Sequence, residues 1–343
     1  MDPLSDFLSR PRARDAFLLR VVMKPPWSVT VTDEAPLSLV PVLHGEAWLW
    51  TEGAEPKHLT AGDVLLVRSP TTYLLASTPE VRTSATIGPG QACSGPDGRD
   101  LSAEFATDIR TWGNDPDGTD VILVGSYRSD GEVDRLLLGA LPPWLVIHDP
   151  APGIVDLLAA EISRDELGQG GVLDRLLDML LIATLRRWIS SGDRETTTWL
   201  AARRDPVVAA AIDAMHEHPQ LPWTLERLAE RAGTSRAGLA RSFHALVGTP
   251  PMAYLTRWRM ARGADLLDRT DMTIGAVAHQ TGYATPFSFS TAFKKWYGLS
   301  PQAYRERDRS VTVPVRHDAE DHAVAAAGPD TRTVDAPVGA DTR

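Results

Sequence analysis

The sequence predicts an α+β protein, with an N-terminal antiparallel β-barrel followed by an all-α domain that contains two helix-turn-helix units. Three observations support this prediction. Short apolar runs separated by turn residues fill most of residues 1–147. From about residue 151 the apolar residues recur at the three- and four-residue spacing of an amphipathic helix. The stretch 224–254 has a second copy at 273–304, and each copy reads as two short helices around a glycine.

The length of the chain predicts more than one domain. One compact core rarely holds 343 residues, so we expect a strand-rich domain at 1–147, a helical linker at 148–204, a helical domain at 205–309 and a disordered tail at 310–343. The start "MDPLSDFLSRPRARD" is charged and lacks the apolar core of a signal peptide. The most apolar stretch, "VLDRLLDMLLIATLRRWI", carries five charged residues. We therefore expect a cytoplasmic protein that does not enter a membrane.

The strand-rich segment contains the runs "FLLRVV", "LSLVPVLHGEAWLW", "HLTAGDVLLVRS", "TYLLAS" and "DVILVGSY". Many short strands at this spacing are typical of an antiparallel barrel or sandwich. The segment has only two histidines, His44 and His58, so the three histidines and one acid of a catalytic metal site cannot be assembled there. Cys93 is the only cysteine, which leaves no disulfide or thiolate cluster within the chain. We expect no metal, no cofactor and no enzymatic activity.

A ligand pocket is predicted from one strand of this segment. Glu46, Trp48 and Trp50 alternate onto one face of that strand, and Tyr73 lies in a later strand. Two indoles, a carboxylate and a phenol on a barrel wall suit an amphipathic or cationic small molecule. The alternative is that these side chains pack within the barrel or against another domain.

The linker sequence predicts two helices separated by "GQGG". The second helix has a wide apolar stripe, with Leu173, Leu177, Leu180 and Trp188 among its members. Such a stripe packs against the strand-rich domain of the same chain, or against a partner helix in a homodimer, or both. Beyond residue 310 the sequence has no periodicity and few large apolar groups, which indicates a disordered tail.

The repeat lies in the only basic part of the chain. Residues 205–310 carry 13 basic and 10 acidic residues, a net charge of +3, although the whole chain has a net charge of −10. Thr224 matches Thr273, Phe243 matches Phe293, and the turn glycine of each copy is also shared. Between the copies, "PMAYLTRWRMARGADLLDRT" predicts one long amphipathic helix that holds two helix-turn-helix units at a fixed separation.

Residues 205–307 resemble the two-unit DNA-binding domain of the AraC/XylS family of bacterial transcription regulators. The resemblance rests on "LERLAERAGTSRAGLARSF", "YLTRWRMARGADLL" and "IGAVAHQTGYATPFSFSTAFKKWYGLSPQAYR". The segments "VLHGEAWLW", "HLTAGDVLLV" and "LLLGALPPWLVI" resemble the cupin-like sensor domain found in one subgroup of this family. The resemblance implies a sequence-specific regulator of the AraC type that responds to a small-molecule effector and activates transcription.

The same resemblance implies double-stranded DNA and RNA polymerase as partners and a homodimer as the assembly. It also implies that 1–147 serves sensing or dimerisation, that 148–204 contributes to dimerisation and that 205–309 binds DNA. The alternative is a non-catalytic cupin-like ligand- or protein-binding module with incidental DNA affinity, because a net charge of +3 is modest.

The resemblance also implies which side chains face the DNA. In the first unit they are Ser235, Arg236, Ala237, Ala240 and Arg241. A guanidinium can bind the O6 and N7 of guanine together, and alanine methyls can contact thymine methyls. We therefore expect Arg241 to read a base, the alternative being a phosphate contact or a solvated surface arginine.

The second unit departs from the family pattern. Its matching positions are Pro286, Phe287, Ser290 and Thr291, and Thr291 stands where the family usually has arginine. Only the two hydroxyls offer hydrogen bonds, while Pro286 and Phe287 contact thymine methyls or pack internally. We therefore expect weaker sequence discrimination here. Lys294, Lys295 and Arg257 are expected to bind phosphates, and Arg259 either does the same or pairs with an acid such as Asp265.

Overall fold

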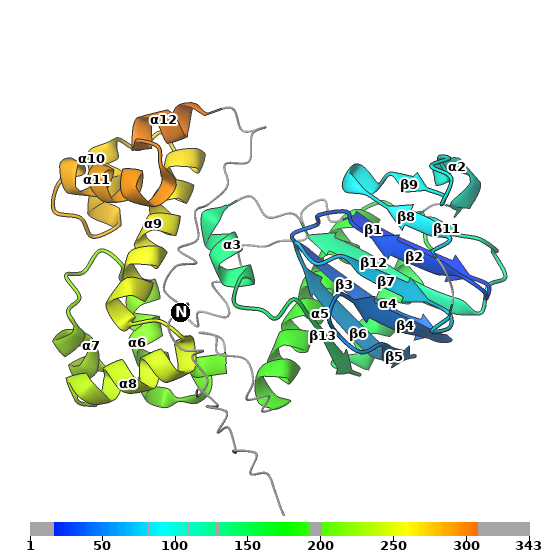
Figure 1. The fold of residues 1–343 in the computed structure, drawn as a ribbon, viewed down its shortest axis with the longest axis horizontal. Helices are drawn as coiled ribbons and strands as arrows, with labels where there is room; N and C mark the ends of the chain where they lie inside the picture. The colour runs from blue at the N-terminus through cyan, green and yellow to red at the C-terminus, as the bar shows by residue number, and fades with distance from the viewer. Residues whose placement is uncertain (1–16, 81–82, 109, 128–130, 192–200, 308–343) are drawn as a thin grey trace, which may run out of the picture.

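The computed structural model describes residues 17–80, 83–108, 110–127, 131–191 and 201–307. Figure 1 shows a strand-rich half and a helical half, with helices α3 (Glu132–Leu138) and α5 (Gln169–Ser191) between them. The predicted change from strands to helices is confirmed. The predicted tail at 310–343 lies outside the described residues.

The strands form two sheets rather than a closed barrel. The larger sheet has seven strands in the order β10 (Ala106–Asp108), β11 (Thr111–Gly113), β1 (Phe17–Met23), β12 (Asp120–Tyr127), β3 (Leu37–His44), β6 (Asp63–Arg68) and β13 (Trp144–His148). The smaller sheet has six, in the order β5 (Lys57–Thr60), β4 (Glu46–Thr51), β7 (Tyr73–Ala76), β2 (Ser28–Val31), β8 (Ala85–Ile87) and β9 (Cys93–Ser94).

The prediction of an antiparallel barrel is therefore corrected in two respects. Each sheet ends in two edge strands within the described ranges, so no ring of paired strands is completed. Most pairs are antiparallel, but β1 runs parallel to β11 and β2 runs parallel to β8. The sequence shows where strands lie but not which strands pair, because pairing depends on contacts between distant segments.

The two faces of the larger sheet pack against different layers. In β3, Leu37 and Leu39 belong to the core formed with the helices, whereas Val40 and Val42 belong to the core between the two sheets. All four side chains are at most 1% exposed. This explains the nearly continuous apolar run of β3, since a strand covered on both faces has no polar side.

Helices α4 (Pro152–Ile162) and α5 cover the outer face of the larger sheet. The hydroxyl of Tyr127, at the end of β12, donates a hydrogen bond of 2.8 Å to the carbonyl oxygen of Leu177 in α5. The predicted packing of this helix against its own strand-rich domain is confirmed. Val172 and Met179 on α5 remain 45% and 51% exposed.

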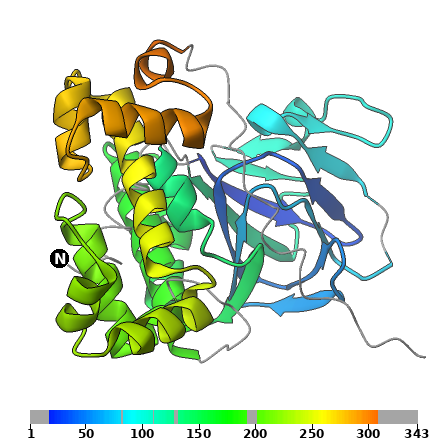
Figure 2. The same ribbon diagram turned by 60° about the vertical axis from the view of Figure 1, so that its left-hand side comes forward.

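The helical half consists of two similar helix pairs joined by one long helix. The first pair is α7 (Leu225–Arg231) and α8 (Arg236–Val247), and the second is α10 (Ile274–Gln280) and α11 (Pro286–Tyr297). Figure 2 shows α9 (Pro251–Arg269) running between them. Helix α6 (Pro206–Glu217) precedes the first pair and α12 (Pro301–Glu306) follows the second.

The two halves of the molecule meet where α3 packs against α9. The buried carboxylate of Asp265 in α9 accepts hydrogen bonds from the backbone N–H groups of Glu132 (2.7 Å) and Val133 (3.4 Å). These N–H groups belong to the first turn of α3, which has no helical partners for them. Arg269 also approaches Asp134 at 3.6 Å. A side chain of the helical half therefore caps a helix of the strand-rich half.

Candidate nucleic-acid interface and ligand cavity

Helices α8 and α11 begin and end in the same way. Ser235 caps α8 by accepting a hydrogen bond of 3.1 Å from the N–H of Gly238, and Thr285 caps α11 by accepting one of 3.1 Å from the N–H of Ser288. Each helix ends at a glycine with positive φ, Gly248 at 80° and Gly298 at 75°. The two copies of the internal repeat therefore form helices with the same kind of cap at each end.

The apolar faces of these helices are fully buried. Leu239 and Phe243 of α8, and Phe289 and Phe293 of α11, are each 0% exposed. The spacing of these residues in the sequence predicted their inward orientation, and the structure confirms it. The remaining side chains of each helix must therefore lie on an outward face.

The outward face of α8 carries one arginine that no described residue contacts through an ion pair or hydrogen bond. Ser235, Arg236, Ala237 and Arg241 are exposed, and Ala240 is half-buried. Arg236 forms an ion pair of 2.8 Å with Glu226 of α7. No ion pair or hydrogen bond of Arg241 is present among the residues that the structure describes. The Arg241 guanidinium thus keeps all its donors available for a ligand.

The outward face of α11 has a different chemistry. Pro286, Thr291, Lys294 and Lys295 are exposed and Ser290 is half-buried. Phe287 is 80% exposed, so it does not pack internally, which was one of the two alternatives for it. The Thr291 hydroxyl donates a hydrogen bond of 3.0 Å to the carbonyl oxygen of Phe287. This face therefore offers mainly an aromatic ring, short hydroxyls and two terminal lysines.

The structure does not place Arg257 and Arg259 with these side chains. Arg257 lines a cleft of about 730 Å³ between the two halves, together with Arg68 of β6 and Arg135 of α3. This place in the cleft sets Arg257 apart from Lys294 and Lys295, and its contact with a DNA phosphate stays a prediction. Arg259 donates hydrogen bonds to the carbonyl oxygens of Pro219 (2.8 Å) and Leu221 (2.7 Å), so it is not the partner of Asp265.

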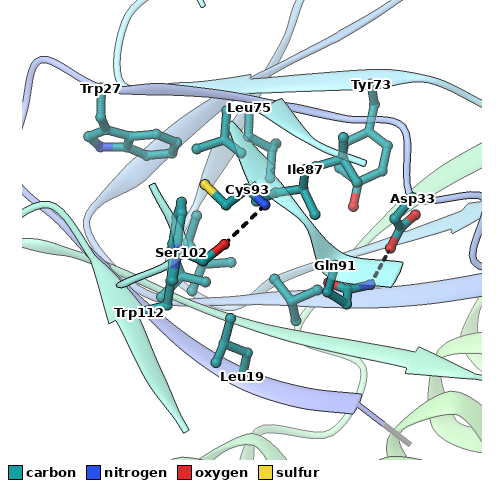
Figure 3. A pocket seen from close by; sticks show the side chains of 15 residues that line it. Leu19, Trp27, Asp33, Tyr73, Leu75, Ile87, Gln91, Cys93, Ser102 and Trp112 are labelled. Carbon is teal, nitrogen blue, oxygen red and sulfur yellow. Dashed lines mark hydrogen bonds between the residues drawn. The ribbon is translucent and has the colours of Figure 1, made fainter. Parts of the chain in front are cut away.

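A mostly apolar cavity of about 170 Å³ lies between the two sheets (Figure 3). Of the four predicted pocket residues only Tyr73 lines it. Glu46, Trp48 and Trp50 do not line it, because the inward side chains of β4 are Ala47 and Leu49, at 0% and 1% exposure. The predicted alternation along β4 is present, but the face assigned to the pocket was the wrong one.

The outer face of β4 forms its own small cluster. The Trp48 ring stacks on the ring of His58 with centroids 4.8 Å apart, and His58 Nε2 lies 2.8 Å from Glu46 Oε2. Trp48, His58 and Glu46 therefore contact one another and not a ligand.

The cavity is lined by residues that sequence reasoning missed, among them Trp27, Asp33, Gln91, Cys93 and Trp112. Alternation of Val29 and Val31 on β2 was the one signal that could have found this face.

Burial raises the pKa of the Tyr73 phenol, and the negative charge of Asp33 raises it further. Burial likewise raises the pKa of the Cys93 thiol. Both groups are therefore neutral at physiological pH. Across the described ranges no group of three or more His, Cys, Asp or Glu side chains is placed to hold a metal ion. None of the described helices is long and apolar enough to span a membrane.

Two family models match the chain. A cupin model covers residues 2–190, and a helix-turn-helix domain model covers residues 228–307. A putative AraC-like transcription regulator of Streptomyces lividans is 31% identical, over 89% of this chain and 98% of the relative. The chain belongs to the AraC-like transcription regulators. The regulator AlkR of Acinetobacter baylyi is also similar, with 31% identity over 54% of this chain and 63% of the relative.

Solved DNA-binding domains are also similar to part of this chain. The DNA-binding domain of AdpA, determined in complex with a target DNA, is 31% identical over 29% of this chain and 90% of that chain, with a TM-score of 0.28. The two family models and the similar regulators make this AraC-like protein a DNA-binding transcription regulator with a cupin N-terminal domain, as the sequence predicted. Regulators of this family are generally not enzymes.

Proposed function

We propose that α8 and α11 of this regulator are the recognition helices of two helix-turn-helix units and enter successive major grooves on one side of the duplex. The observation that carries the proposal is the repeated helix pair, with matching caps and an outward face on each second helix. Helix α9 has 19 residues, a length of about 28 Å. This is close to the roughly 34 Å of one DNA turn that two such helices must span.

The two units read DNA unequally in this proposal. Arg241 has no protein partner among the described residues and reads a guanine through both of its terminal nitrogens. Helix α11 has no arginine on its outward face, and the Thr291 hydroxyl already donates within the helix. Phe287 therefore reads apolar groups, while Lys294 and Lys295 hold phosphates. The first unit supplies most of the sequence discrimination.

Regulation of the bound state is also part of the proposal. The protein acts as an effector-responsive activator that contacts RNA polymerase, and it binds DNA as a homodimer. The exposed Val172 and Met179 on α5 support the dimer, because they leave an apolar stripe on the solvent side of a helix whose other side is buried. The Asp265 cap on α3 supports communication between the halves.

Selection of bound sequences from random duplex DNA tests the proposal. The purified full-length protein at physiological salt is expected to enrich one bipartite site, with its two halves about one helical turn apart. Addition of that site upstream of a promoter is then expected to raise transcription by purified RNA polymerase. Failure to enrich any sequence above the starting library would contradict the DNA-reading role of α8 and α11.

A further inference from the structure

The cavity between the two sheets is built by elements from both of them. Leu19 and Val21 of β1 and Ile122 and Val124 of β12 come from the larger sheet. The smaller sheet contributes Val29, Val31, Tyr73, Leu75, Ile87 and Cys93. Figure 3 shows these side chains pointing toward a shared space, with Asp33, Gln91 and Tyr73 gathered at one end. Ser102 is exposed, so this part of the wall meets the solvent.

The polar end of the cavity contains a hydroxyl that no described residue satisfies. Tyr73 is 3% exposed, and no hydrogen bond to its hydroxyl exists among the described residues. Asp33 accepts hydrogen bonds from Gln91 Nε2 at 3.0 Å and from the N–H of Ala35 at 3.2 Å. The Tyr73 hydroxyl is not among the buried polar atoms that lack a partner, so a molecule inside the cavity can reach it. Its donor and acceptor are therefore available to a ligand.

We propose that this cavity binds a small neutral or cationic molecule with a ring-sized apolar body and one hydrogen-bonding group, held by Tyr73 and Asp33. The size of the cavity sets the size of the body. A dry cavity of about 150 Å³ lined by apolar side chains is enough for benzene, and this one measures about 170 Å³. Most of its 15 lining residues are apolar, so they hold the body by burial rather than by polar contacts.

The charge of the wall excludes anions. Asp33 is the only charged residue among the 15 that line the cavity, and none of them is basic. An anionic ligand would therefore face a carboxylate at low dielectric with no compensating cation. An amine or a hydroxyl group, in contrast, can donate to Asp33 and accept from Tyr73, whose phenol stays protonated.

The cavity wall is physically continuous with the helical half. Strand β12 carries Ile122 and Val124 into the cavity and, a few residues on, anchors α5 through the Tyr127 hydroxyl. Helix α3 follows β12 in the chain, and Asp265 of α9 caps it. A ligand that changes the position of β12 therefore acts on both connections. This effect on DNA binding rests on the proposed function, whereas binding in the cavity does not.

Three probes of one size test the ligand class on the full-length protein: p-cresol, benzylamine and benzoate. Ligand-observed NMR is expected to show binding of the first two and at least tenfold weaker binding of benzoate. Tyr73→Phe is expected to weaken the binding of p-cresol by about 2- to 10-fold, the range for loss of one hydrogen bond. Tyr283→Phe is the matched control, because Tyr283 lies in the helical half and its hydroxyl also has no hydrogen bond among the described residues.

Cys93 reports where the probe binds, because it lines the cavity and is the only cysteine of the chain. Bound p-cresol is expected to slow alkylation of Cys93 by N-methylmaleimide. Ile87→Phe, which fills the cavity, is expected to abolish both the binding and the protection.

Benzoate binding as tight as that of p-cresol would overturn the charge argument. Binding that Tyr73→Phe and Ile87→Phe leave unchanged would overturn the site. Binding as expected with no change in DNA affinity would retain the site and refute the effector role alone.

Discussion

At the scale of single residues, Arg241 carries the strongest prediction. Its exposed guanidinium has no partner among the described residues, whereas neighbouring Arg236 is held by Glu226. Arg241→Ala is expected to reduce binding to the selected site by about 1–3 kcal/mol and to relax preference at one base pair. Titration of a set of single-base variants of the site, followed by fluorescence anisotropy, measures both effects.

Arg164→Ala is the control, since it removes an exposed positive charge from the loop between α4 and α5 in the other half of the molecule. It is expected to leave the ranking of the base-pair variants unchanged. An Arg241→Ala protein with an unaltered base preference would show that this arginine contacts only phosphate or solvent.

Phe287 gives a second prediction at this scale. A phenyl ring that is 80% exposed on the outward face of α11 buries its apolar surface only when DNA covers it. Replacing the contacted thymine by uracil removes one methyl group and is expected to cost about 0.8 kcal/mol. In the Phe287→Ala protein the same replacement is expected to have no effect. If the replacement weakened binding of both proteins equally, Phe287 would not be the residue that contacts the thymine methyl group.

Lys294 is predicted to act without sequence preference. It lies in the last turn of α11, and its ammonium group is exposed. Lys294→Ala is expected to weaken binding to all DNA sequences by the same factor. It is also expected to reduce the slope of log affinity against log salt concentration by about one. A changed base preference, or an unchanged salt slope, would contradict the phosphate contact.

At the scale of elements, the contact between α3 and α9 is predicted to depend on pH. Burial raises the pKa of the Asp265 carboxyl from 3.8 to about 6, against the opposing effect of the N–H of Glu132. The folded protein therefore binds an extra proton between these pH values, so the free energy of unfolding falls as the pH rises from about 4 to about 6. The contribution is at most about 3 kcal/mol.

Urea unfolding of the wild type and of Asp265→Asn between pH 4 and pH 7.5 measures this contribution. The asparagine keeps an oxygen that accepts from the first turn of α3 but cannot ionise. The difference in stability between the two proteins is expected to change across pH 4–6 and to be constant above pH 7. Parallel stability curves over the whole range would show that Asp265 has an ordinary pKa.

The elements differ in how far the sequence predicts them. Helix α8 was predictable with its ends, because Ser235 and Gly248 mark its caps and Leu239 and Phe243 mark its buried face, and all of these signals are local. The arrangement of the sheets was not predictable in the same way. The pairing of β1 with β11 joins residues about 90 positions apart, and nothing local specifies it.

The ligand site shows the same limit. Alternation along β4 was visible in the sequence, but Trp48 and Ala47 exchange roles if the strand turns its other face to the core. Large aromatic residues favour burial, which made Trp48 and Trp50 the natural choice for the inner face. In the structure, the stacking of Trp48 on His58 supports the opposite orientation.

At the scale of the whole molecule, one hydrophobic core joins the two halves. It includes Leu39 of the larger sheet, Leu177 and Trp188 of α5, and Leu228 and Phe243 of the first helix pair. The second helix pair has a separate core. Damage to the first core is therefore expected to affect the strands and the first helix pair together.

Leu177→Ala tests this coupling. Leu177 is 1% exposed, so its truncation is expected to reduce stability by about 2–5 kcal/mol. Hydrogen exchange is expected to accelerate in β3 and in α8 alike. Leu157→Ala is the matched control on the neighbouring helix α4, because Leu157 is 57% exposed. Faster exchange confined to the strand-rich half would show that the two halves unfold independently.

The central claim is that this regulator reads DNA through two unequal helices, and one measurement tests it most directly. Sequence selection is carried out in parallel with the wild type and with Arg241→Ala, both full length and at physiological salt. The wild type is expected to enrich a bipartite site with one sharply defined half and one looser half about a helical turn away. Arg241→Ala is expected to retain the looser half and to lose the guanine of the sharp half. Identical enriched sites for both proteins, or no enrichment by the wild type, would contradict the account.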